Sequence, residues 1–147
     1  MTRQTLEKAE LFLQAWKEAG QYGEQAMLAV AFALRNRQRA GWEGGDWLRV
    51  IQNCGRLRYN KGPANDVGFP DLRNPVVYRF LTRVDAIYGG SAPDTYTSCT
   101  HPIEGVRTGK YWAELDKITD EKFLLSVVRC PGAHPKTSQV GGLTFFA

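Results

Sequence analysis

The sequence predicts a mainly helical α+β fold with a small antiparallel sheet late in the chain. From Thr5 to Ala19, and again between Asn74 and Gly90, apolar residues recur at the three- and four-residue spacing of one helix face. After Gly109 the chain carries short aromatic and β-branched segments, which are typical of strands. With 147 residues, 43% of them hydrophobic, we expect residues 1–147 to form a single domain with its own core.

Two helices are expected first. The first covers Thr5 to Ala19 and stops at Gly20, and the second covers Glu24 to Ala40 and stops at Gly41. The apolar stripe of the first helix consists of Leu6, Ala9, Leu13 and Trp16. The second is apolar on all sides through its middle, but that run, Ala26 to Leu34, is about half of the roughly 20 residues that a membrane span needs. We therefore expect a buried central helix and no membrane span.

The next elements follow from cap and stop residues. Asp46 is expected to cap a short helix, Trp47 to Asn53. The segment Cys54 to Arg73 is broken by glycines and prolines and is predicted to be a long loop. Asn74-Pro75 then has the cap and first-turn order of a helix, which Gly89-Gly90 closes.

Strands are expected near the end of the chain. After a second loop, Ser91 to Gly109, we predict a strand over Lys110 to Leu115 and a helix over Thr119 to Arg129. The segment Val140 to Phe146 is predicted to be a closing strand that pairs antiparallel with Lys110 to Leu115.

Composition limits the class of protein and its site. The net charge of +4 and the pI near 9.1 favour a polyanion, whether nucleic acid or an anionic cell-wall polymer. The N-terminus is charged and helical, so we expect no signal peptide, and action inside a cell or release by another route both stay open. Three scattered cysteines, two histidines and no nucleotide-binding or HExxH motif lead us to expect no metal and no cofactor. A thiol site at Cys99 and His101 is supported only by a spacing that is common by chance. The carboxylates therefore remain as the candidates for catalysis.

Glu18 is the carboxylate that the helical pattern singles out. It lies opposite the main apolar stripe of the first helix, a position that by itself is typical of an exposed glutamate. However, Leu11, Ala15 and Glu18 form a second row along the helix, so we expect Glu18 to be half-buried at the rim of a cleft. Partial burial favours the protonated form of a carboxyl, which can act as a general acid.

Three segments resemble the SleB-like cell-wall hydrolases, the family of the spore-cortex lytic enzymes. "KEAGQYGEQAMLAVAFALRNR" resembles the family's opening motif, and counting back from Asn36-Arg37 places Glu18-Ala19 on its Glu-Ala pair. "TGKYWAEL", Thr108 to Leu115, resembles its Gly-rich aromatic strand, and "VGGLTFF", Val140 to Phe146, resembles its C-terminal strand. The middle third of the chain has no matching motif.

The resemblance implies a peptidoglycan glycosidase, typically a lytic transglycosylase, on a lysozyme-like scaffold. Glu18 would protonate the oxygen that links N-acetylmuramic acid to N-acetylglucosamine and then accept the proton of the muramoyl 6-hydroxyl. The second helix would be the platform behind Glu18, with Asn36 and Arg37 tying the surrounding loops to it. The implied partner is the glycan strand of peptidoglycan, bound by a monomer.

Several roles stay open within this reading. A hydrolase needs a second carboxylate about 5 Å or about 6.5 to 9.5 Å from the first, and the candidates are Glu24, Glu114 and Asp116. Tyr22, Tyr111 and Trp112 are candidates for stacking on sugar rings, although Trp112 fits the core equally well. The sequence departs from the family at Tyr22, where a second glutamate is common, and at Leu143, where many members have histidine. His134 is a candidate to replace that histidine in substrate binding.

Two other functions are weighed against the enzyme. A nucleic-acid-binding domain would use Tyr59 and a group of basic residues that spreads over a helix end and a loop rather than one helix face. These basic residues are Arg35, Arg37, Arg39, Arg49, Arg56, Arg58 and Lys61. The second alternative is a non-catalytic relative that only binds glycan, which the presence of Glu18 disfavours.

Overall fold

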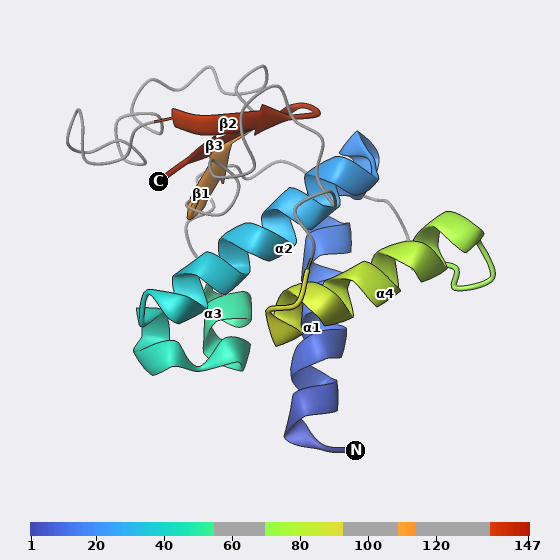
Figure 1. Ribbon diagram of the computed structural model, residues 1–147, viewed down its shortest axis with the longest axis horizontal. Coiled ribbons are helices and arrows are strands. Elements are labelled where there is room, and N and C mark those ends of the chain that lie inside the picture. The colour runs from blue at the N-terminus through green and yellow to red at the C-terminus, as the bar shows by residue number, and fades with distance from the viewer. Residues whose placement is uncertain (55–69, 93–108, 114–135) are drawn as a thin grey trace.

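The computed structural model of the protein describes residues 1–54, 70–92, 109–113 and 136–147, which form a group of helices and one small sheet (Figure 1). The α-helices in these ranges are α1 Arg3–Ala19, α2 Glu24–Arg39, α3 Trp47–Asn53 and α4 Pro75–Gly89. Short 3-10 turns, η1 Gly20–Tyr22 and η2 Trp42–Gly45, follow α1 and α2. The strands are β1 Tyr111–Ala113, β2 Lys136–Val140 and β3 Leu143–Phe146. The predicted mainly helical chain with a small antiparallel sheet late in the sequence is confirmed.

The helix ends follow local capping. Asp46 and Asn74 each accept a hydrogen bond from a backbone N–H in the first turn of α3 and α4, as predicted, and Gly90 adopts the left-handed conformation that ends α4. The first helix begins at Arg3 rather than at Thr5, because the side chain of Thr2 caps it. The predicted helix over Thr119 to Arg129 lies outside the described residues.

Helix α2 forms the centre of the core. Every residue from Ala26 to Arg37 is buried, since α1 and α4 cover one side of α2 and the sheet approaches the other (Figure 1). The rings of Phe12 in α1 and Phe80 in α4 meet at 5.3 Å between centroids. None of the helices in the described part of the chain is long and apolar enough to cross a membrane.

The sheet has the order β1-β3-β2, with β3 in the middle. Strand β1 pairs antiparallel with β3, Trp112 opposite Phe145, so the predicted pairing of these two segments is confirmed. The segment Val140 to Phe146 is not one strand, however. Gly141 has a φ of 58°, which lets the chain reverse there, so Val140 ends β2 and Leu143 begins β3.

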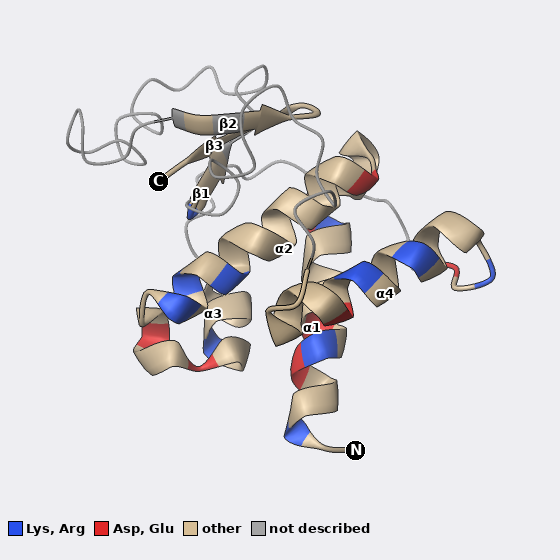
Figure 2. Ribbon diagram, viewed as in Figure 1, with Lys and Arg blue, Asp and Glu red and all other residues tan. Residues whose placement is uncertain are grey.

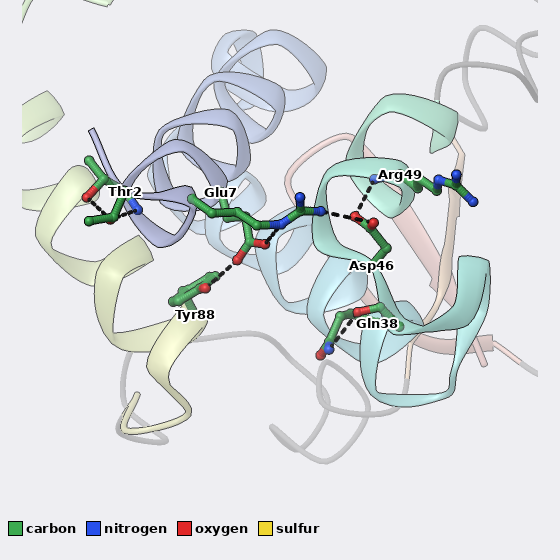
Figure 3. A network of polar contacts seen from close by, with 9 residues as sticks. Thr2, Glu7, Gln38, Asp46, Arg49 and Tyr88 are labelled. Carbon is green, nitrogen blue, oxygen red and sulfur yellow. Dashed lines mark hydrogen bonds and ion pairs between the residues drawn. The ribbon is translucent and has the colours of Figure 1, made fainter.

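A polar network joins α1, α3 and α4 at the end of the molecule near the N-terminus (Figure 3). Arg3 forms ion pairs with Glu7 in its own helix and with Asp46, the cap of α3. The Tyr88 hydroxyl donates a hydrogen bond to Glu7 Oε2 at 2.5 Å, and the Tyr88 ring lies 5.1 Å from that of Trp47. Burial and the bond to Glu7 raise the pKa of Tyr88 to about 12.

This shift makes stability depend on pH in the alkaline range. An unfolded tyrosine ionises near pH 10, whereas folded Tyr88 keeps its proton up to about pH 12. The stabilisation that protonated Tyr88 gives to the folded state is therefore complete below pH 10 and is lost as the pH rises from 10 to 12. We expect the free energy of unfolding to fall by about 1–2 kcal/mol more in the wild type than in Tyr88→Phe between pH 10 and 12. Urea unfolding at a series of pH values measures the difference, with exposed Tyr78→Phe as the control. Parallel curves for the wild type and Tyr88→Phe would contradict the assignment.

Candidate active site

Glu18 lies in the last turn of α1, directly before the chain turns into α2. It is half-buried, and the other members of its helical row, Leu11 and Ala15, are fully buried. Gln14 Nε2 donates a hydrogen bond to Glu18 Oε1 at 2.9 Å. The predicted half-burial at the end of this row is therefore confirmed, whereas a cleft at this position stays a prediction.

Asn36 and Arg37, in the last turn of α2, hold the chain at the start of β1. Asn36 Nδ2 donates to the carbonyl oxygen of Gly109 at 2.8 Å, and Arg37 Nε donates to that of Lys110 at 2.6 Å. Both side chains are buried, so these bonds satisfy N–H groups of Asn36 and Arg37 that would otherwise be costly to bury. The expectation that this helix end ties neighbouring segments to the platform is confirmed for β1.

Three aromatic rings surround the guanidinium group of Arg37. Its central carbon lies 4.8 Å from the ring centroid of Trp42, 5.7 Å from that of Tyr111 and 4.6 Å from that of Trp112. Burial lowers the pKa of Arg37 to about 10, while the charges of Cys54, Tyr111 and Glu18 act in the opposite direction. The Glu18 carboxylate is thus one of the charges that act on Arg37.

Tyr22 contacts the turn between β2 and β3 near the start of α2, at the other end of this helix from Arg37. A carbon added at Gly142 would lie 2.5 Å from Tyr22 Cε1, and one added at Gly141 would lie 3.1 Å from the Tyr22 carbonyl oxygen. The two glycines therefore let the hairpin approach η1 closely. All three segments that resemble family motifs meet along α2 in this way.

We expect Gly142→Ala to lower the free energy of unfolding by about 1–3 kcal/mol, because the new methyl group overlaps the Tyr22 ring. The cost should largely disappear in a Tyr22→Ala background, where the ring is absent. Gly89→Ala, which meets no atom within 4 Å, is the matched control. Denaturant unfolding of the wild type, the two single variants Gly142→Ala and Tyr22→Ala and their double variant measures the coupling, and equal costs in both backgrounds would show that Tyr22 does not restrict Gly142.

Glu24, the first candidate for a second carboxylate, is engaged elsewhere. Its carboxylate forms ion pairs with Arg79 Nη2 at 2.6 Å and with Arg83 Nη1 at 2.8 Å, and both arginines belong to α4. These ion pairs hold the start of α2 against α4, and they disfavour a catalytic role for Glu24. The other predicted positions, Glu114, Asp116 and His134, lie outside the described residues, as do Cys99 and His101, whose spacing the sequence analysis set aside.

The basic residues do not form one surface stripe in the described part of the chain. Arg35 and Arg37 are only 6% and 5% exposed, and Figure 2 shows the other basic residues spread over several helices and mixed with acidic ones on α1. Arg56, Arg58, Tyr59 and Lys61 belong to the part that the structure does not describe. The described residues thus give less support to a nucleic-acid interface than the sequence did.

Two neighbours of the site were not predicted. Gln14 lies one helical turn before Glu18, a spacing that is visible in the sequence but common among surface glutamines. Trp42 reaches Arg37 only because Gly41, in the left-handed conformation, turns the chain back after α2. No local sequence pattern predicts that this turn brings Trp42 back to Arg37.

A separate depression of about 310 Å³ is lined by Glu43, Arg49, Gln52 and Asn53. Its lining is polar, without an aromatic side chain, and it includes none of the residues predicted for catalysis or sugar binding. The candidate site is therefore assigned to Glu18 and the cluster around Arg37.

Comparison with protein-family models, with curated proteins and with solved structures found no match to this chain. The candidate site is accordingly defined by the residues and contacts described above.

Proposed function

We propose that the protein is a peptidoglycan-degrading glycosidase, a lytic transglycosylase of the SleB-like type on a lysozyme-like scaffold, with Glu18 as its acid and base. The observation that carries the proposal is the meeting of the three motif-like segments along α2. Arg37 bonds to Lys110 and contacts Trp112, and Tyr22 contacts the Gly141-Gly142 turn. The three segments resemble motifs of one family and follow each other along the chain in that family's order. They are thus also neighbours in space.

The proposed reaction needs one carboxyl group. Protonated Glu18 gives its proton to the glycosidic oxygen as the bond between that oxygen and C1 of the muramoyl sugar breaks. The resulting Glu18 carboxylate then accepts the proton of the 6-hydroxyl group, whose oxygen bonds to C1 and closes the 1,6-anhydro ring. The ion pairs of Glu24 with Arg79 and Arg83 support this version over one in which Glu24 activates water.

Substrate binding is assigned to Tyr22, in the turn after α1, and to the two aromatic residues of β1. Tyr22, Tyr111 and Trp112 are all partly exposed, so each keeps surface on which a pyranose ring can lie. Arg37 and Trp42 hold the rings of β1 from the protein side. His134 stays a candidate for the same function.

Mass spectrometry of the fragments released from purified peptidoglycan tests the proposal. We expect muropeptides that end in 1,6-anhydromuramic acid and are lighter by one water than hydrolytic products. Reducing muramic ends alone would show a hydrolase with a second carboxylate, and binding without release would show a non-catalytic glycan-binding protein. No release and no binding would overturn the proposal altogether.

A further inference from the structure

We propose that the depression between η2 and α3 binds the zwitterionic end of a peptide stem, that is, a carbon atom that carries both an ammonium and a carboxylate group. This inference rests on the function proposed above, because such stems are attached to the glycan strands of peptidoglycan. It adds a binding site outside the catalytic and sugar-binding residues, and it makes the stem a determinant of substrate choice.

The depression brings two opposite charges to one surface. Its volume of about 310 Å³ lies at the lower end of the range for ligand pockets. Glu43 lines it from η2 and Arg49 from α3, together with the carboxamides of Gln52 and Asn53. In the described ranges, Glu43 and Arg49 form no ion pair with each other or with a third residue. A ligand that carries both charges can therefore pair with both side chains at once, while the carboxamides bond to its other polar atoms.

The nearby carboxylate of Asp46 is engaged elsewhere. It accepts a hydrogen bond from the backbone N–H of Arg49 and forms an ion pair with Arg3. Figure 3 shows the guanidinium group of Arg49 extending away from this carboxylate. The planar guanidinium group can bind a ligand carboxylate through two parallel hydrogen bonds.

The backbone at Glu43 supports a role for its side chain. Its φ of 52° lies in the left-handed region, and among the described residues it is the one non-glycine residue there. The next two residues, Gly44 and Gly45, adopt the same region without the steric cost of a Cβ atom. A glycine would avoid this cost at position 43 as well. Residues held in such conformations cluster at ligand sites, which favours a binding role for the Glu43 carboxylate.

The position of the depression indicates a peptide stem as the source of the zwitterion. Glu43 directly follows Trp42, whose ring lies 5.4 Å from that of Tyr111, a residue assigned to sugar binding. A stem attached to a sugar on β1 can thus reach the depression past Trp42. The negative charge of Glu43 disfavours a polyanion in the same place.

Binding of free stem peptides to the full chain tests the site without requiring catalysis. The probe is the tripeptide L-Ala-γ-D-Glu-meso-diaminopimelate, whose last side chain ends in an ammonium and a carboxylate group on one carbon. The matched peptide has L-Lys in the last position, which keeps the ammonium and lacks that carboxylate. We expect the first peptide to bind with a Kd at least about tenfold lower than the second. Its binding should shift the backbone NMR signals of Glu43, Arg49, Gln52 and Asn53.

Arg49→Gln and Glu43→Gln remove the two charges one at a time, and each should raise the Kd of the diaminopimelate peptide about tenfold. Both side chains are exposed, so the midpoint of thermal unfolding should change little. Arg73→Gln, at a side chain that is 92% exposed, and Glu10→Gln are the controls and should leave the Kd unaltered. Equal Kd values for the two peptides, or unaltered binding by both charge variants, would overturn the site. Free meso-diaminopimelate that binds as tightly as the tripeptide would overturn the stem as its ligand.

Fragment release from cell walls separates this inference from the proposed function. At low substrate, we expect the wild type to release fragments faster from walls with diaminopimelate stems than from walls with lysine stems, and Arg49→Gln to remove the difference. Fragment release by a protein that binds neither peptide would overturn the stem site alone. Selective peptide binding without any fragment release would overturn the proposed function and leave the stem site in place.

Discussion

Glu18→Gln is expected to lower the rate of cell-wall lysis by about 10² to 10⁴ while the fold stays intact. The carboxamide has the size and shape of the carboxyl group but cannot transfer a proton, and general acid–base catalysis is worth roughly this factor. Its oxygen can still accept the bond from Gln14, so the local structure should persist. Turbidity of purified cell walls gives the rate, and circular dichroism with thermal unfolding tests the fold.

The controls separate catalysis from the general effect of removing a charge. Glu10→Gln, the same change in the same helix, should leave the rate unaltered. Glu24→Gln should weaken the ion pairs with Arg79 and Arg83 and lower stability, but it should cost far less activity than Glu18→Gln. If Glu24→Gln instead abolished lysis in a folded protein, the single-carboxyl mechanism would be wrong.

Phe80→Ala is expected to lower the free energy of unfolding by about 3–5 kcal/mol. Phe80 is 0% exposed and contacts Phe12, so the substitution leaves a cavity between α1 and α4 in addition to losing apolar burial. The loss is a large part of the stability of a domain of this size. Denaturant unfolding measures it directly.

Tyr78→Ala is the matched control, because it removes an aromatic ring two residues earlier in α4. Tyr78 is 62% exposed, and its loss should change stability by no more than about 0.5 kcal/mol. A small effect of Phe80→Ala would show that α4 is not a necessary part of the core that supports α1 and α2.

Local features explain most of what could be predicted. The caps Asp46 and Asn74 act within two or three residues, and glycines end the helices by their own conformations, so these elements are readable from short segments. The half-burial of Glu18 was also predictable, because the periodicity of one helix defines the row that it ends. The start of α1 was missed because Thr2 precedes the apolar pattern that marked the helix.

Contacts between distant segments account for the features of the site that could not be predicted. Glu24 and Tyr22 were both candidate site residues from their places in one motif. Only the fold brings Arg79, 55 residues away, to Glu24 and the Gly141-Gly142 turn to Tyr22. A sequence pattern cannot rank such partners, since many arginines and glycines could meet either residue.

The sequence by itself determined the helical class, the central buried helix, the pairing of the two late segments and the position of Glu18 on α1. The tertiary structure alone decided the contacts between distant segments: the three aromatic rings around Arg37 and the ion pairs of Glu24 with α4. The physical reason is that helix periodicity and capping depend on neighbours within a few residues. The surroundings of a buried or half-buried charge depend instead on which distant groups can approach once the whole core has packed.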